Sequence, residues 1–139
     1  MKILHLNFVP RSADLSLLIL RLWFGTPLFL LHGWSKLVGY STMAHAFPDP
    51  LQIGHPLSWG LTIFSEVLCA ALIVLGLFTR IAALVAIIEY CVAFWLVHGH
   101  RLSGPGSGEL AYLYLGAFLL LFIAGPGKMS VDGKIGGSV

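Results

Sequence analysis

The sequence predicts an all-α integral membrane protein, folded as an antiparallel bundle of four transmembrane helices with both termini in the cytoplasm. Three observations lead to this fold class. The composition is apolar with few charges, four apolar stretches have about the length that crosses a bilayer, and Lys and Arg are unequally divided between the connecting segments. Together they describe a single membrane domain over residues 1–139.

Composition argues against a soluble monomer. Of 139 residues, 58% are hydrophobic and 10% charged, whereas a typical soluble domain has about 25% charged residues. So few charges cannot cover a water-facing surface. The net charge is +2 and there is no run of Lys or Arg, so nucleic acid is not an expected partner. Two cysteines cannot form a disulfide scaffold, and no Cys/His spacing resembles a metal site.

The apolar stretches give the predicted spans. A helix rises about 1.5 Å per residue, so about 20 residues cross roughly 30 Å of hydrocarbon. The predicted spans are residues 15–37, 59–78, 81–97 and 110–124. Open sheet edges and lipid-exposed loops are excluded from the hydrocarbon core, so we interpret all four stretches as helices.

The connections between the predicted spans differ in length. Residues 76–80 leave almost no loop, so the second and third spans should form a tight antiparallel hairpin. Residues 38–58 form a long extracytoplasmic connection whose three prolines prevent a continuous helix, and we expect it to fold over the membrane surface. Residues 98–109 hold a Gly/Ser/Pro cluster and form a flexible turn.

Basic residues set the predicted orientation, since four spans place both termini on one side of the membrane. The basic residues on that side are Lys2, Arg11, Arg80, Lys128 and Lys134, and those on the other side are Lys36 and Arg101. The positive-inside rule therefore predicts cytoplasmic termini. A cleaved signal peptide is the alternative, because residues 44–46 mimic a cleavage site, but this site lies too far beyond an apolar core that is itself too long.

Three ionisable residues lie inside the apolar stretches: Arg21, Glu66 and Glu89. An ionisable residue at the centre of a span costs roughly +2.5 to +3.5 kcal/mol, so it should face protein or water. Depth counted along straight helices places Arg21 and Glu89 together in the cytoplasmic half, as an ion pair. The same count places four residues in the outer half, as a polar cluster: His32, Lys36, Glu66 and Glu109. The candidates for a polar core, a ligand site or a proton relay are Arg21, His32, Lys36, Glu66, Glu89 and Glu109.

Each of these residues also has a structural interpretation. A buried ion pair of Arg21 with Glu89 could serve only to lock helix register. Lys36, at the end of a span, could be a snorkelling anchor, and Glu109 could stabilise a helix N-terminus through the helix dipole. Glu66 is the residue to which we assign a function, because it lies inside a span without an obvious basic partner at its own depth.

Two histidines at similar depth, His32 and His98, raise the question of a haem, which some four-helix bundles hold between two histidines. On a straight helix, however, His98 lies about 180° from Glu89, so both cannot point into the bundle and haem is disfavoured. On the same helical wheel Cys91 points away from Cys69, so a disulfide between them is not expected.

Short motifs follow one another through the chain in a fixed order. They are Arg21 with Gly25, residues 32–37, residues 47–54, Glu66, residues 75–80, His98, Glu109, Leu113, Tyr114, residues 125–128 and residues 130–132. In order and spacing they resemble the DoxX family of small bacterial and archaeal membrane proteins, over nearly the whole chain. Glu89 departs from the family pattern, in which an apolar or hydroxyl residue is expected.

The resemblance implies a four-span protein of the plasma membrane. Some members of the family are associated with thiosulfate:quinone oxidoreductase, and others with membrane complexes that handle thiol and oxidative stress. The resemblance therefore implies soluble oxidoreductase or sulfurtransferase-like partners and a quinone as ligand. The chain has no Rossmann fingerprint, cluster ligands or cofactor-attachment motif, so electrons would pass through a bound quinone or a partner.

Three functions stay open on the sequence. In the first, a cleft between the spans of a redox-complex subunit accepts a quinone-like or small polar ligand, which Arg21, His32 and Glu66 bind or supply with protons. The candidate aromatic contacts are Trp23, Trp34 and Phe64. In the second, the chain is a non-catalytic scaffold that recruits soluble partners. In the third, which would require a homo-oligomer, it passes small solutes.

Overall fold

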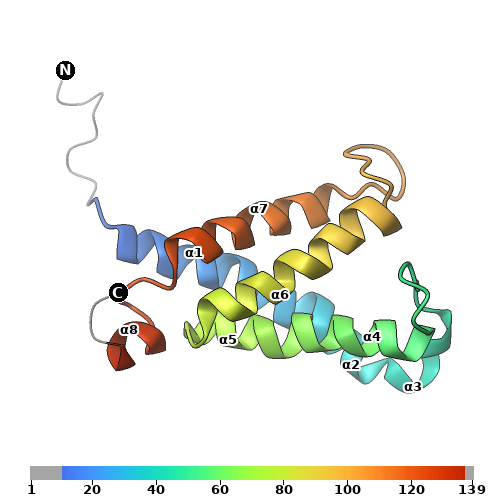
Figure 1. Ribbon diagram of the computed structural model, residues 1–139, viewed down its shortest axis with the longest axis horizontal. Coiled ribbons are helices and arrows are strands. Elements are labelled where there is room, and N and C mark those ends of the chain that lie inside the picture. Colours follow the sequence, from blue (N-terminus) through green and yellow to red (C-terminus); the bar gives the residue numbers. More distant parts are fainter. Residues whose placement is uncertain (1–10, 137–139) are drawn as a thin grey trace.

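The computed structural model describes residues 11–136 and shows an all-helical bundle (Figure 1). Three helices, Ala13–Val38, His55–Leu75 and Thr79–Val97, are long and apolar enough to cross a membrane, and Glu109–Ala124 is a shorter apolar helix. They run alternately back and forth, as the predicted antiparallel bundle requires. One end of the bundle carries the turn at residues 76–78 and the C-terminal segment, and we call it the hairpin end. The other end carries residues 39–54 and 98–108, and we call it the loop end.

Each of the three long helices contains a π turn. The first comprises α1 (Ala13–Pro27), a π turn (Leu28–Gly33) and α2 (Trp34–Val38). The second comprises α4 (His55–Ile63), a π turn (Phe64–Cys69) and α5 (Ala70–Leu75), and the third comprises α6 (Thr79–Val92) and a π turn (Ala93–Val97). The fourth helix, α7 (Glu109–Ala124), is uninterrupted. Shorter elements are α3 (Tyr40–Met43), a 3-10 turn (Ala44–Ala46) and α8 (Val131–Ile135).

The second helix differs from its predicted limits of 59–78. It begins at His55 because Gly54 turns the chain with a φ of 102°, and Pro56 follows in the first turn, where a missing N–H leaves no hydrogen bond unmade. It ends at Leu75 because Gly76 adopts the left-handed conformation, with a φ of 71°. The prediction was wrong because it treated Pro56 only as a helix breaker, and the long connection is correspondingly shorter than 38–58.

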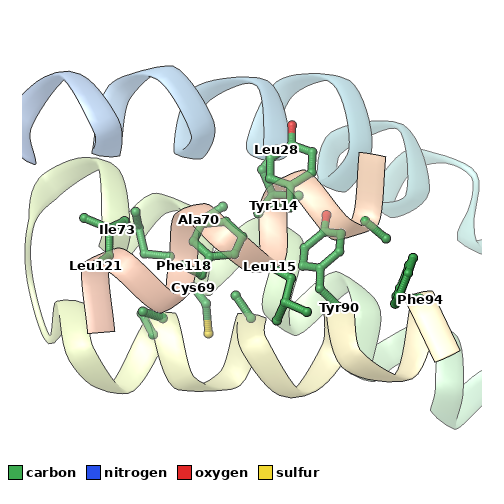
Figure 2. Packing of buried hydrophobic residues seen from close by; sticks show 14 residues of the cluster. Leu28, Cys69, Ala70, Ile73, Tyr90, Phe94, Tyr114, Leu115, Phe118 and Leu121 are labelled. Atoms are coloured by element: carbon green, nitrogen blue, oxygen red, sulfur yellow. The ribbon is translucent and has the colours of Figure 1, made fainter. Parts of the chain in front are cut away.

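Small residues and aromatic rings make the core. The buried face of α6 contributes Ala82, Ala83 and Ala86, which let α7 pack closely along it. Figure 2 shows Tyr114 and Tyr90 at the centre of this core, with ring centroids 5.1 Å apart. Large apolar side chains also cover the outside of the helices, which suits a bundle surrounded by lipid.

The C-terminal segment closes the hairpin end. The Asp132 carboxylate accepts hydrogen bonds from the backbone N–H of Phe78 at 2.9 Å and of Thr79 at 3.0 Å, and from the Thr79 hydroxyl at 3.1 Å. These donors lie at the start of α6, so Asp132 caps that helix from a distant part of the chain. The backbone N–H of Lys128 donates to Asp14 at 2.8 Å, which attaches the same segment to α1.

Candidate functional site: a polar patch in a lipid-side cavity

Arg21 does not pair with Glu89. Its side chain is 1% exposed, and its guanidinium donates to the carbonyl oxygens of Val74, at 3.3 Å, and Met129. The expected pairing was wrong because Arg21 turns toward the hairpin end, where the last carbonyls of α5 lack partners within their own helix. A Cβ on Gly76 would collide with the same guanidinium. Arg21 therefore joins the first helix to the end of α5 and to the C-terminal segment, and it lies outside the cavity described next.

A cavity of about 630 Å³ lies toward the loop end, between the α4 helix with its π turn and the α6 helix with its π turn. Most of its wall is apolar. Its polar side chains include His32, Lys36, Ser65, Glu66, Glu89 and His98. Four of the six candidate polar residues, His32, Lys36, Glu66 and Glu89, therefore share one cavity, whereas the sequence divided them between two depths.

Lys36 and Glu66 form an ion pair between Nζ and Oε2. The side chain of Glu66 is 5% exposed and that of Lys36 is 22% exposed, so the pair is largely withdrawn from the surface. The two helices approach closely here because Gly33 lacks a side chain, and its Cβ would lie 2.6 Å from the backbone carbonyl carbon of Glu66. The sequence places Lys36 and Glu66 in one outer polar cluster without pairing them, and in the structure they are partners.

Glu89, on α6, also lines the cavity and lies near the hydroxyls of Thr62 and Ser65. Glu89 Oε2 and Ser65 Oγ are both buried, and neither has a hydrogen-bond partner among the described residues. A buried polar atom without a partner loses about 1 to 3 kcal/mol relative to water. Because the Ser65 and Thr62 hydroxyls lie within hydrogen-bond reach of the Glu89 carboxyl, a small rotation of these side chains lets them satisfy one another.

His98 enters the cavity because of the π turn in the third helix. A π turn holds one residue more than an α turn, so it rotates the residues that follow by about 100°. The prediction that His98 faces away from Glu89 was therefore wrong, since it assumed a straight α-helix. The ring of His98 is fixed by a hydrogen bond between Nδ1 and the carbonyl oxygen of Gly106, at 3.0 Å. His32, on the first helix, also lines the cavity, and its ring lies edge-on to that of Tyr114 with the ring centroids 5.9 Å apart.

The other candidates lie elsewhere. Glu109 is exposed in the first turn of α7, where a carboxylate favours the helix dipole, and it does not line the cavity. Trp23 and Trp34 are 73% and 53% exposed and point outward, so neither can stack on a ligand in the cavity. Phe64 alone of the three aromatic candidates lines it. Neither tryptophan lines the cavity, because the position of a ring along a span does not give the direction in which the ring points.

The connection at residues 39–54 folds over the loop end and contributes to the cavity wall. Asp49 organises it by accepting hydrogen bonds from the Ser58 hydroxyl at 2.7 Å and the backbone N–H groups of Gly54 at 2.8 Å and Ile53 at 3.1 Å. These bonds, led by that of Ser58, hold the pKa of the Asp49 carboxyl below its ordinary value. The Trp59 ring donates to the carbonyl oxygen of Lys36 at 3.2 Å, which ties this end of α4 to α2.

Sequence reasoning missed Ser65 as a cavity residue and considered His98 only as a haem ligand. Ser65 directly precedes Glu66, so its position next to a functional candidate was a usable signal. His98 carried none, because a π turn has no recognisable sequence pattern. Within residues 11–136, no three His, Cys, Asp or Glu side chains are grouped so that they could hold a metal ion.

Comparison with known proteins gives the family. The DoxX family model matches residues 16–99, which include the polar part of the cavity. The chain belongs to the DoxX family. Two relatives from Haemophilus influenzae, each described as an uncharacterized protein, are 30% identical to it, over 127 residues (87% of this chain and 83% of the relative) and over 120 residues (77% and 81%). No solved structure matches the chain. The resemblance predicted from the motifs is confirmed, and this DoxX-family chain is a membrane protein.

Proposed function

We propose that this DoxX-family protein binds a lipid-soluble, quinone-like molecule in the cavity and acts as the membrane subunit of a redox complex. The observation that carries the proposal is the set of polar groups that line one mainly apolar cavity, namely the Lys36–Glu66 pair with Glu89 and Ser65. Apolar walls with a few convergent polar groups are typical of small-molecule sites.

Size and chemistry both favour such a ligand. The volume of about 630 Å³ falls within the roughly 300 to 1,000 Å³ of small-molecule pockets. A quinone ring is flat and apolar, which suits the wall formed by Phe64 and its neighbours, and its oxygens can reach Lys36 or the histidine rings. Its apolar tail can leave toward lipid, because wall residues such as Leu61 and Ile88 are 50% and 59% exposed.

The chain's own residues would bind the ring and move protons. Glu66 with Lys36, and His32 beside them, are the groups that can accept or release a proton next to the ring oxygens. Electrons would come from or go to a protein partner, as the family resemblance implies. The partner would dock at the membrane surface. The bundle would lie in the plasma membrane, with both termini in the cytoplasm.

The test is extraction of the full chain in mild detergent, followed by mass spectrometry of co-purifying quinones and proteins. We expect a quinone or its reduced form to co-purify with the wild-type chain. Ala93→Phe should fill the cavity and remove the quinone, whereas Ala124→Phe, on the exposed end of α7, should retain it. If the wild-type chain carries no quinone and binds none on addition, the proposal is wrong. If protein partners co-purify equally with both variants and quinone with neither, the chain is a scaffold.

A further inference from the structure

We propose that a groove at the hairpin end binds the phosphate of an anionic phospholipid, with Lys128 and Lys134 as the residues that contact the phosphate. The groove has a volume of about 440 Å³ and shares no residue with the cavity described above. Its wall comprises Leu18 of α1, Leu75 of α5 and five residues of the C-terminal segment, namely Lys128, Met129, Ser130, Val131 and Lys134. This is a second site, so it does not depend on the proposed function.

The positive charge of the groove is not balanced by the chain itself. Both lysine side chains are exposed, and among residues 11–136 neither ammonium group has an acceptor. The two acidic residues at this end, Asp14 and Asp132, accept hydrogen bonds from backbone N–H groups, Asp14 from Lys128 and Asp132 from the start of α6. Both ammonium groups therefore remain available to an anion from outside the chain, with which a charged hydrogen bond is strong.

The two lysines lie on a backbone that the bundle holds in place. The carbonyl oxygen of Met129, next to Lys128, accepts from the Arg21 guanidinium. The backbone N–H of Asp132 donates to the carbonyl oxygen of Gly76 at 2.8 Å, and Figure 1 shows α8 beside the turn that joins α5 to α6. A segment that is already ordered loses less conformational entropy when a ligand binds. The C-terminal segment therefore presents both lysines as part of a fixed groove.

The apolar part of the groove selects a lipid over a soluble anion. Leu75 and Met129 are 56% and 49% exposed, so apolar surface lies beside the ammonium groups. Leu22 lies one turn beyond Leu18 on the same face of α1 and is 44% exposed, so an acyl chain can continue along this helix into the hydrocarbon region. A free phosphate would leave this apolar surface uncovered, and a zwitterionic lipid would bring a second cation close to the lysines. An anionic phospholipid suits both parts of the groove.

The test is native mass spectrometry of the full chain, delipidated in mild detergent and titrated with two phospholipids that have the same acyl chains. They are phosphatidylglycerol, which is anionic, and phosphatidylcholine, which is zwitterionic. We expect phosphatidylglycerol to bind about twentyfold more tightly, which is roughly fivefold for each lysine. Equal affinity for the two lipids would overturn the proposal. Excess ammonium phosphate should not displace phosphatidylglycerol, and displacement would mean that the groove is a site for a soluble anion and that the lipid assignment is wrong.

Variants separate the groove from the general charge of the hairpin end. Lys128→Gln and Lys134→Gln should each weaken the binding of phosphatidylglycerol about fivefold and leave that of phosphatidylcholine unchanged. Arg80→Gln is the matched control, because it removes one positive charge at the same end, on α6, from a residue that does not line the groove. It should retain the wild-type preference. A loss in Arg80→Gln equal to that in the lysine variants would show that the lipid follows diffuse surface charge, and a preference retained in both lysine variants would equally overturn the site. The comparison of lipids on the wild-type chain does not depend on whether a variant folds.

Discussion

Replacement of Gly33 by alanine tests the closest approach between the first and second helices. The added Cβ would lie 2.6 Å from the backbone carbonyl carbon of Glu66 and 2.9 Å from Val67 Cγ2, whereas ordinary contacts begin at 3.4 Å. The Glu66 carbonyl oxygen would lie closer still, so the helices must separate by about 1 Å, since backbone atoms cannot turn aside as a side chain can. Overpacking costs about 1 to 3 kcal/mol, and a backbone obstacle places Gly33→Ala in the upper half of this range, about 2 to 3 kcal/mol.

The measurement is unfolding in mixed micelles titrated with sodium dodecyl sulfate and followed by far-ultraviolet circular dichroism. Gly116→Ala is the matched control, because its Cβ would meet no atom within 4 Å. Alanine also favours a helix over glycine by up to about 1 kcal/mol. We expect Gly116→Ala to be neutral or stabilising. If Gly33→Ala unfolds at the same detergent fraction as Gly116→Ala, the two helices are not in contact at this position and the packing that supports the Lys36–Glu66 pair is wrong.

Three further predictions concern the polar contacts. Lys36→Met should lower the free energy of unfolding by about 2 to 4 kcal/mol, because it leaves the Glu66 carboxylate buried without a partner. The double variant Lys36→Met with Glu66→Gln should cost less than the two single changes added together. If the costs measured by detergent unfolding are strictly additive, the ion pair is refuted. Asp132→Ala should cost about 1 to 2 kcal/mol and speed hydrogen exchange at the Thr79 amide, whereas unchanged exchange would mean that the cap does not form. Because the pKa of Asp49 is lowered in the folded chain, its contribution to stability is fully present above about pH 3.9 and is lost as the pH falls through the lowered value. Asp49→Asn should therefore make the free energy of unfolding depend less on pH in the acid range. An unchanged pH dependence there would contradict this.

The helices could be predicted because the length of an apolar stretch is read directly from the sequence. Three of the four predicted spans agree with the observed helices to within two residues at each end. The exception is the second span, where His55 and Leu75 replace 59 and 78 as the limits. Both errors come from backbone conformation, since the helix limits at Gly54 and Gly76 depend on positive φ angles that a count of apolar residues does not register.

The contacts of the ionisable residues could be predicted only in part. That Glu66 faces the interior follows from the cost of placing a carboxyl group in lipid. The identity of the basic residue that pairs with Glu66 does not follow in the same way. Position along a span gives the depth of a side chain in the membrane, but it does not give the direction in which that side chain points. Arg21 was assigned to Glu89 on height alone, whereas its guanidinium is long enough to turn along the helix toward Met129. A long flexible side chain therefore makes depth a poor guide to its partner.

The π turns explain why a helical wheel misplaced part of the site. Each long helix changes register once, and each change lies beside the cavity: Gly33 ends the first π turn, Glu66 lies within the second, and His98 follows the third. A wheel drawn at 100° per residue is correct on either side of such a turn and wrong across it. Because π turns concentrate at functional sites in proteins generally, three of them around one cavity support its assignment as the site independently of the residues that line it. The same geometry accounts for His98, since the π turn before it brings its ring into the cavity that a straight helix would have turned it away from.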